Sequence, residues 1–195
     1  MEYSAIAPIM GQLWSPVAAV TTRWENKVNA QIAVSIGAAS IVPHRPRVIV
    51  QIYKGNYSHL LVHRSQVFAL NFLRSDQLHL IKAFGFVSGK DHDKLADVAY
   101  DVKVTGSPIL QDCWGYLDCR VVNALDGGDM TCFLADVLEG GTLSQGKPLW
   151  WRDARRELPR EWLEEWDRKI SAAIKVSEQQ MDHIDYTPWG PGGDS

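Results

Sequence analysis

The chain has 195 residues, of which 46% are hydrophobic and 22% are charged, as in ordinary globular domains. Its formal net charge of -3 at pH 7 argues against a general nucleic-acid binder, because such proteins carry a basic face. The longest weakly polar stretch, residues 31–43, is too short to cross a bilayer, and the N-terminus lacks the basic start of a signal peptide. We therefore expect one cytoplasmic domain over residues 1–195 that binds neither nucleic acid nor membrane.

The sequence contains no motif of a common metal or nucleophilic site. A Walker loop, a Rossmann fingerprint and Gly-x-Ser-x-Gly are absent, so no residue is assigned a catalytic role. The cysteine count is odd, without a Cys-x-x-Cys pair, and we interpret Cys119 and Cys132 as small buried side chains. His59 and His63 have the i, i+4 spacing of a metal pair, but no third ligand is evident, so no metal is expected.

The first half of the chain alternates apolar, β-branched runs with turn residues, which predicts short strands and a few short helices. Pro43 and Pro46 break the chain before a strongly β-branched run. Ser58 is suited to cap a helix, and the charged residues 90–94 (KDHDK) indicate a solvated loop or a helix start. The predicted helices are residues 1–10, His59–Arg64 and Gln77–Phe86, and the predicted strands are Val17–Arg23, Gln31–Ser35, Val48–Tyr53 and Val67–Leu73.

The second half contains a predicted hairpin and a long helix. Residues 117–125 (LDCRVVNAL) and 131–138 (TCFLADVL) have the composition of strands, and the Asp-Gly-Gly-Asp between them suits a tight turn. Residues 159–181 have apolar positions at helical spacing, which predicts an amphipathic helix with Pro159 in its first turn. Several short strands with few helices predict a mainly β fold: a β-barrel with peripheral helices and a C-terminal amphipathic helix.

Seven segments, in this order and spacing, resemble the flavin reductase family. Ser15–Thr22 resembles the first barrel strand of these proteins, P-x-x-V-x-V-V-T-T, and Asn29–Ser35 resembles their N-x-M-T-V-S-S segment. Gly128–Thr131 is similar to the family's G-D-H-T. The remaining segments are Ser40–Val50, Asn56–His59, Phe68–Leu73 and Leu117–Val121. The Trp-rich C-terminal segment resembles the family less and is similar to a subgroup such as the flavoredoxin-like proteins.

This resemblance implies an FMN-binding split β-barrel that forms a homodimer, with FMN, or FAD as the alternative, near the dimer interface. The corresponding layout is a barrel core over residues 10–140, a C-terminal helix over 159–183 and a loose tail over 187–195. Many members reduce flavin with NADH or NADPH and pass it to a monooxygenase, whereas others keep the flavin and shuttle electrons. We therefore expect an FMN-binding, NAD(P)H:flavin reductase-like oxidoreductase that passes electrons to free flavin or a partner protein.

Small residues after the second predicted strand form the expected site for the flavin ring. Residues 37–39 (GAA) have almost no side chain, so backbone N–H groups there would reach the polar edge of the ring. Donors near ring atoms N1 and O2 favour the negative charge of the reduced flavin. By residue type alone, close packing of two strands is the commoner use of small residues. The expected ring site comprises Ser35, Ile36, Gly37, Ala38, Ala39 and Ser40.

The turn after the third predicted strand is the expected site for the flavin phosphate. Lys54 offers a positive charge, and N–H groups at the start of a helix attract anions. A turn closed by a capping serine is the commoner use of such a sequence. The expected phosphate contacts are Lys54, Asn56, Tyr57, Ser58 and His59.

Two departures from the family pattern bear on catalysis. The family's T-V-S-S becomes Ala33-Val34-Ser35-Ile36, so two hydroxyls that often touch the flavin are absent. The histidine of G-D-H-T, which lies near the nicotinamide site in many reductases, is Met130. Hydride transfer needs stacked rings and no protein acid or base, so a reductase remains the first hypothesis. An FMN-binding electron carrier or sensor without its own nicotinamide site is the alternative, and a barrel that has lost flavin is a third.

Eight tryptophans are many for a chain of this length. Core and interface packing is the expected role for most of them. A Trp beside an Arg can hold an aromatic anion, so the cluster Trp150-Trp151-Arg152 is the exception. Trp162 and Trp166 would leave an apolar helix face exposed without a partner, which is a further reason to expect a dimer. The expected ring-stacking or substrate contacts are Trp150, Trp151, Arg152 and Met130.

Overall fold

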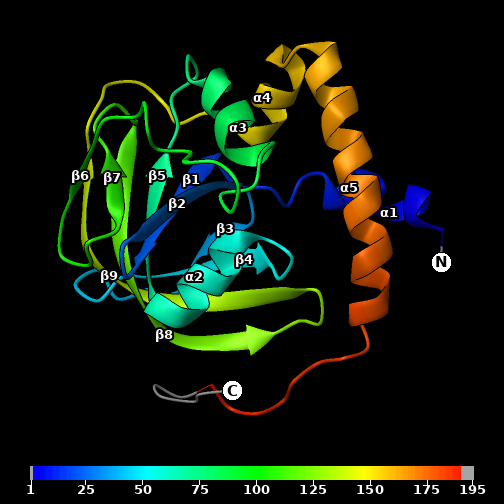
Figure 1. The fold of residues 1–195 in the computed structure, drawn as a ribbon, viewed down its shortest axis with the longest axis horizontal. Helices are drawn as coiled ribbons and strands as arrows, with labels where there is room; N and C mark the ends of the chain where they lie inside the picture. Colours follow the sequence, from blue (N-terminus) through cyan, green and yellow to red (C-terminus); the bar gives the residue numbers. More distant parts are fainter. Residues whose placement is uncertain (1, 190–195) are drawn as a thin grey trace.

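The computed structural model describes residues 2–189 of the chain (Figure 1). Its main element is a seven-stranded antiparallel sheet in the order β2-β1-β5-β8-β9-β4-β3. A small second sheet pairs β6 with β7. The strands are β1 (Ala18–Trp24), β2 (Lys27–Ala33), β3 (Ile36–Ala38), β4 (Arg47–Tyr53), β5 (Val67–Phe72), β6 (Tyr100–Val102), β7 (Pro108–Leu110), β8 (Gly115–Asp126) and β9 (Met130–Thr142).

The large sheet curls into a half-open barrel. Its two long strands, β8 and β9, are irregular at Asp118/Cys119 and at Val121/Asn123, and such bulges bend a strand and increase its twist. The curl also brings β2, at one edge of the sheet, into contact with β4 near the other edge. The prediction of a mainly β, split-barrel fold is confirmed.

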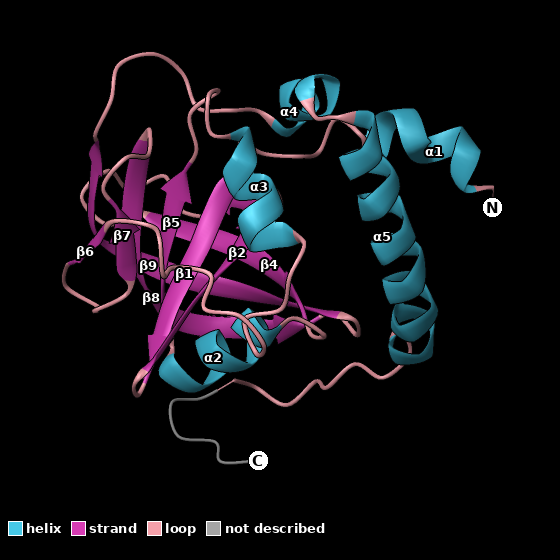
Figure 2. Cartoon of the chain, turned by 45° about the horizontal axis from the view of Figure 1, so that its top comes forward, coloured by secondary structure: helices cyan, strands magenta, loops and turns pink. Residues whose placement is uncertain are grey.

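Helices cover the ends and one side of this barrel (Figure 2). α2 (Tyr57–Ser65) packs on β1 and β2, while α3 (Leu78–Gly85) and α4 (Trp151–Glu157) lie together at the opposite end of the barrel. α5 (Arg160–Gln180) runs along the side, and α1 (Tyr3–Met10), which has no buried residue, lies on the outer side of α5. The predicted C-terminal helix is therefore observed as α5.

The barrel separates two hydrophobic cores. One fills the inside of the barrel and includes Val50, Phe68 and Phe133, all fully buried. The other lies between the sheet and the three helices α3, α4 and α5, with Ile81 and Phe84 among its members. Burial of this apolar area is the main contribution to the stability of the fold.

Aromatic side chains fasten the start of α5 to the second core. The ring of Phe86 lies 6.4 Å from that of Trp162 and 5.5 Å from that of Trp166, between centroids. The ring of Trp151 lies 5.6 Å from that of Trp166. These distances are typical of favourable aromatic pairs. The two tryptophans of α5 thus pack within the chain, which removes the reason for assigning them to a dimer interface.

The structure differs from several predicted elements. β2 begins at Lys27 rather than Gln31, because its first half pairs with the end of β1. α2 begins at Tyr57 with Asn56 as its N-cap, and Ser58 is not the capping residue. The short elements β3, β6, β7 and α4 were not predicted, since three to seven residues carry too little periodicity to be recognised.

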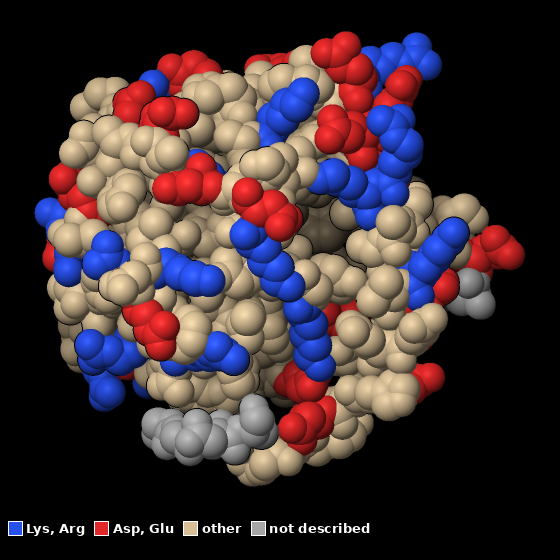
Figure 3. Space-filling model, in the orientation of Figure 1, with Lys and Arg blue, Asp and Glu red and all other residues tan. Residues whose placement is uncertain are grey.

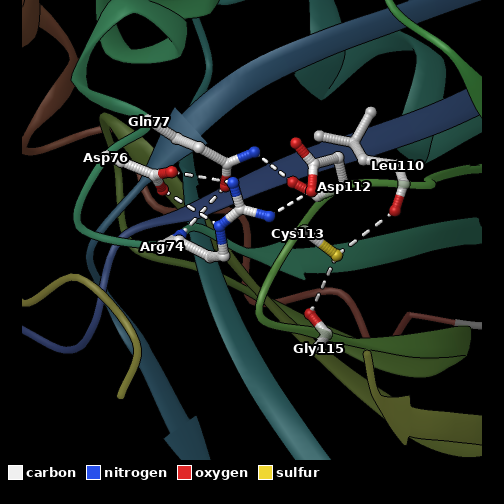
Figure 4. A network of polar contacts seen from close by, with 7 residues as sticks. All are labelled: Arg74, Asp76, Gln77, Leu110, Asp112, Cys113 and Gly115. Carbon is white, nitrogen blue, oxygen red and sulfur yellow. Dashed lines mark hydrogen bonds and ion pairs between the residues drawn. The ribbon is translucent and has the colours of Figure 1, made fainter. Parts of the chain in front are cut away.

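A polar network joins the loop after β5 to the loop before β8 (Figure 4). Arg74 donates hydrogen bonds to Asp76 at 2.9 and 2.8 Å and is also paired with Asp112. The buried thiol of Cys113 bonds to two backbone carbonyl oxygens, at 3.3 and 3.4 Å. Burial raises the pKa of the Cys113 thiol to about 11, so the side chain is protonated and structural at neutral pH.

Among residues 2–189, no helix combines the length and the apolar character needed to cross a bilayer. Of the tail predicted over 187–195, only residues 187–189 belong to the described part of the chain, and the rest of that prediction lies outside it.

Candidate functional site

A cavity of about 520 Å³ lies between the barrel and α5, and it is called the α5 cavity below. Its walls come from β2 and the residues after it, the end of β4 with the start of α2, the loop after α3, the β8–β9 turn and one face of α5. Figure 3 shows this hollow beside α5, with basic side chains at its edge. Segments distant in the sequence therefore meet around one space large enough for a small-molecule ligand.

Two buried side chains of β2 give the α5 cavity unpartnered hydrogen-bond acceptors. Asn29 is 2% exposed and Gln31 is 6% exposed, and both line the cavity. Asn29 Nδ2 donates to Ser58 Oγ at 2.7 Å. Asn29 Oδ1 and Gln31 Oε1 have no hydrogen-bond partner among the described residues. A buried acceptor left unpaired costs about 1–3 kcal/mol, so a ligand that donates to these atoms would be favoured.

A half-buried lysine supplies positive charge to the same space. Lys94 Nζ donates to the backbone oxygens of Ala30 at 2.9 Å and Phe84 at 2.7 Å. An ammonium group has three donors, so one remains for a ligand. Burial, with a smaller contribution from the nearby charge of Lys169, lowers the pKa of Lys94 to about 8. The group is therefore mainly protonated at neutral pH, and it has no acidic partner among the described residues.

The end of the α5 cavity near β4 carries several of the predicted site residues. Ser35 Oγ donates to Gln51 Oε1 at 2.9 Å, and both residues line the cavity. Met130, at the predicted nicotinamide side, lines it as well. The predicted residues that the structure brings together around the cavity are Ser35, Asn56, Tyr57, Ser58 and Met130.

Two residues of the predicted phosphate site face other partners. Lys54 Nζ forms an ion pair with Asp126 at 2.7 Å, which neutralises its charge. The His59 ring shares a hydrogen bond of 2.8 Å between Nε2 and Thr131 Oγ1. Burial, followed by the charges of His63 and Lys54, lowers the pKa of His59 to about 4, so the ring is neutral at pH 7. Neither Lys54 nor His59 lines the α5 cavity.

The predicted ring residues after Ser35 also lie outside the cavity lining. Ile36, Gly37 and Ala38 form the edge strand β3, which pairs with β4. A Cβ built on Gly37 would lie 3.4 Å from the Ile49 side chain, an ordinary contact. Residues 39 and 40 follow in the loop, and Ala39 N donates to the backbone oxygen of Arg47 at 2.8 Å. Their part in binding stays a prediction.

The predicted Trp-Trp-Arg cluster lies at the start of α4, outside the cavity lining. Trp151 is buried in the second core, whereas Trp150 is 45% exposed. Arg152 is exposed and pairs with Asp153 at 3.3 Å. The two tryptophans therefore have different environments, and of the two only Trp150 is exposed.

Sequence reasoning missed the residues that give the α5 cavity its polarity. Asn29 and Gln31 have the i, i+2 spacing that places two side chains on one face of a strand, which was the available signal. Lys94 belongs to a charged run that indicates a solvated loop, and only the packing against β2 and α3 shows otherwise. The face of α5 that closes the cavity was predicted to be apolar but without a known partner.

A second hollow, of about 640 Å³, lies between the β8–β9 hairpin and residues 184–189. It contains none of the predicted site residues. Within residues 2–189, no three His, Cys, Asp or Glu side chains are grouped as metal ligands would be.

The chain matches the family model described as the flavin reductase like domain over residues 10–159. Among curated proteins, it is 31% identical over 132 residues to the high molecular weight rubredoxin of Moorella thermoacetica, a match that covers 67% of this chain and 57% of that protein. The chain spans between 23% and 57% of the length of the first curated relatives that it matches.

The chain is also similar to solved structures. The nitrilotriacetate monooxygenase component B homologue from Mycobacterium thermoresistibile is 26% identical, with a TM-score of 0.66 over 75% of this chain and 80% of that chain. The FMN-binding protein from Thermus thermophilus, solved with bound 1-cyclohex-2-enone, is 25% identical, with a TM-score of 0.62 over 67% of this chain and 71% of that chain. In both cases the matched portion leaves part of this chain without a counterpart.

Proposed function

We propose that this chain, which belongs to the family of flavin reductase like domains, binds FMN in the α5 cavity and acts as an NAD(P)H-dependent flavin oxidoreductase. The observation that carries the proposal is a pair of buried hydrogen-bond acceptors in the cavity that have no donor within residues 2–189. Asn29 Oδ1 and Gln31 Oε1 are buried, unpartnered among the described residues and placed on one strand. Lys94 adds a cation to the same space.

Flavin carries the hydrogen-bond donors and the anionic group that would partner these side chains. Its ring N3–H and its ribityl hydroxyls are donors for the two amide oxygens, and its phosphate is an anion for Lys94. The apolar cavity residues, among them Ile32, Val34 and Ile170, suit the flat faces of the ring. The residues present therefore fit FMN, and FAD would need additional room for its adenosine part.

FMN, when bound, supplies the hydride-accepting chemistry that protein side chains lack. The work of the chain is to bind and orient it and to exclude water from one face. The family name supports a reductase, the Thermus thermophilus neighbour is called an FMN-binding protein, and the Mycobacterium neighbour is called a monooxygenase component. Electrons would accordingly pass to free flavin, to a monooxygenase or to another acceptor protein.

We further propose that the protein works as a homodimer. The support is the exposed apolar surface at the N-terminal end, where the side chains of Tyr3, Ile9 and Leu13 are about two-thirds exposed (65%, 66% and 66%). Light scattering at micromolar protein concentration would give a dimer mass, and a monomer mass would remove this part of the proposal.

Purified, dialysed protein tests the proposed activity. FMN titration followed by fluorescence should show saturable binding, and steady-state assays should show NADH or NADPH oxidation that depends on FMN. Binding without oxidation by either nicotinamide would remove the reductase activity and leave the flavin site. Absence of FMN binding would remove the flavin site itself.

A second candidate function is an FMN-binding electron carrier or sensor without a nicotinamide site. Met130 favours it, because this residue lines the α5 cavity where the family pattern has histidine. A carrier would keep FMN through dialysis, and the flavin would be reduced slowly or not at all by NADH or NADPH under anaerobic conditions. Rapid anaerobic reduction would exclude the carrier.

A further inference from the structure

We propose that α5 completes the flavin site from outside the family domain: its inner face is a wall of the α5 cavity, and Lys169 together with Lys94 forms the subsite for the flavin phosphate. This proposal rests on the proposed flavin binding. The matched family domain ends at residue 159, and α5 begins at Arg160. The wall and its lysine are therefore an addition of this chain to the matched domain.

One face of α5 lines the cavity. The lining residues are three or four positions apart, as expected for neighbours on one side of a helix. This face is apolar except at its second residue, a lysine, and its last residue, a serine. The residues are Trp166, Lys169, Ile170, Ala173, Ile174 and Ser177.

The helix is held at both ends, so the wall has a fixed position. Near its start, Trp166 packs against Phe86 and Trp151 at 5.5 and 5.6 Å between ring centroids. Beyond its end, Met181 touches the β8–β9 turn so closely that a Cβ built on Gly128 would lie 2.7 Å from the Met181 backbone oxygen. About 12 Å of helix separates Lys169 from Ser177, the last residue of α5 that lines the cavity.

The two lysines form an uncompensated cationic end of the cavity. Lys169 Nζ lies 5.6 Å from the centre of the Phe86 ring, and Lys94 Nζ is bonded to the backbone oxygen of the nearby Phe84. Neither ammonium group has an ion pair among the described residues. Their repulsion also contributes to the lowered pKa of Lys94. A dianion between them would be stabilised by both charges.

The β8–β9 turn contributes an acidic residue to the cavity. Asp129 lines it, next to the start of β9, and its backbone oxygen accepts a hydrogen bond from Lys54 N at 2.9 Å. The charge of Lys54 itself is taken up by Asp126. A phosphate is therefore better placed at the lysine end than at the start of α2. The ring would then point towards Ser35 and Gln51, whose side chains are uncharged.

A pair of lysine substitutions on one helix tests the phosphate subsite. Lys169→Met removes the charge and keeps a good helix former, and Lys175→Met is the matched control on the exposed side of α5. The dissociation constants of FMN and riboflavin are measured for each variant by fluorescence titration. We expect Lys169→Met to weaken FMN by about tenfold, because a charge-assisted contact is lost, and to leave riboflavin unchanged. Lys175→Met should change neither.

A pair of alanine substitutions tests the wall. Ala173→Trp fills the cavity from α5 and should weaken FMN and riboflavin together by more than about tenfold, since an overfilled site excludes the ring. Ala172→Trp places the same side chain on the exposed side of the helix and should have no effect. Circular dichroism of all four variants checks that α5 remains folded.

The outcomes separate this proposal from the proposed function. Equal weakening of FMN and riboflavin by Lys169→Met, or no change in either, would overturn the phosphate subsite. Equal affinities in Ala173→Trp and Ala172→Trp would overturn the wall. Failure of the unmodified protein to bind either flavin would overturn the proposed function, and this inference with it.

Discussion

Asn29 on β2 donates a hydrogen bond from Nδ2 to the Oγ of Ser58 in the first turn of α2, at 2.7 Å. Both side chains are buried, and both line the α5 cavity. The bond orients the amide so that Oδ1 is left unpartnered among the described residues. One contact therefore ties an edge strand of the barrel to a helix and presents an acceptor to a ligand.

Gln31→Leu should separate binding from stability. Gln31 Oε1 is a buried acceptor without a partner in the described chain, so its removal should leave the free energy of unfolding unchanged or raise it by about 1 kcal/mol. The affinity for FMN should fall by about tenfold, since the ligand loses an acceptor in a buried site. Chemical denaturation and FMN titration measure the two quantities.

Gln179→Leu is the control for this substitution, because Gln179 lies on the exposed part of α5. It should leave both quantities unchanged. A Gln31→Leu protein that loses stability but keeps its FMN affinity would show that the amide serves the fold rather than a ligand.

Gly89→Ala should disturb the other acceptor that is unpartnered in the described chain, Asn29 Oδ1. A Cβ on Gly89 would lie 1.9 Å from Asn29 Oδ1, so the Asn29 amide would have to move and its bond to Ser58 would break. We expect a loss of about 1–3 kcal/mol in the free energy of unfolding, as for other buried hydrogen bonds that lose their geometry, together with weaker FMN binding.

Gly37→Ala is the comparison, because its Cβ would make only an ordinary contact with Ile49. Gly37 lies outside the α5 cavity, so FMN affinity should remain within about twofold of the unmodified protein, as for surface substitutions in general. If Gly37→Ala abolishes binding while Gly89→Ala does not, the ring lies at β3 instead.

Much of the fold follows from local patterns. The alternation in residues 117–125 and 131–138 and the Asp-Gly-Gly-Asp turn predicted the β8–β9 hairpin, and the turn is built by Gly128 at φ +91°, which favours glycine. The strands extend beyond the predicted bounds, to Gly115 and Thr142, because pairing continues through residues whose own preference for strands is weak.

The pH dependence of stability should report on His59. Its pKa of about 4 in the folded protein lies below the ordinary value of 6.5. Between these values the unfolded chain binds more protons than the folded protein, so the contribution of His59 is complete above about pH 6.5 and is lost as the pH falls towards 4. The loss should amount to about 1–3 kcal/mol, a range that allows for partial solvent exposure.

Denaturation of the unmodified protein and of His59→Gln at about pH 7.5 and about pH 5 measures this contribution. The difference between the two pH values should shrink in His59→Gln and stay unchanged in His92→Gln, which alters an exposed histidine. The same pH dependence in all three proteins would contradict the assignment to His59.

Gly128→Ala should loosen the far end of α5. Gly128 has φ +91°, and its Cβ would meet Met181 backbone atoms at 2.7 and 2.9 Å. Gly146 has φ +95° and nothing within 4 Å, so Gly146→Ala carries the same backbone strain, about 1–2 kcal/mol, without the contact. Only Gly128→Ala should weaken FMN binding. Equal effects of the two substitutions on affinity would show that the position of α5 does not matter.

The candidate site was harder to predict than the fold, for a physical reason. Ser35, Ser58 and Met130 were found because their segments resemble a family pattern. Lys94 and the inner face of α5 were not, because a charged run and an amphipathic helix have the same sequence signature whether they face solvent or a cavity. Which neighbour covers them depends on packing between segments that are distant in the chain.

Hydrogen exchange of backbone amides, measured with and without FMN, tests the location of the site most directly. FMN bound in the α5 cavity should slow exchange in β2, in residues 84–94 and along α5 from Trp166 to Ser177, with little change in residues 36–40. Slower exchange in residues 36–40 and 54–59, with α5 unchanged, would contradict this location and would place the flavin on the outer edge of the barrel.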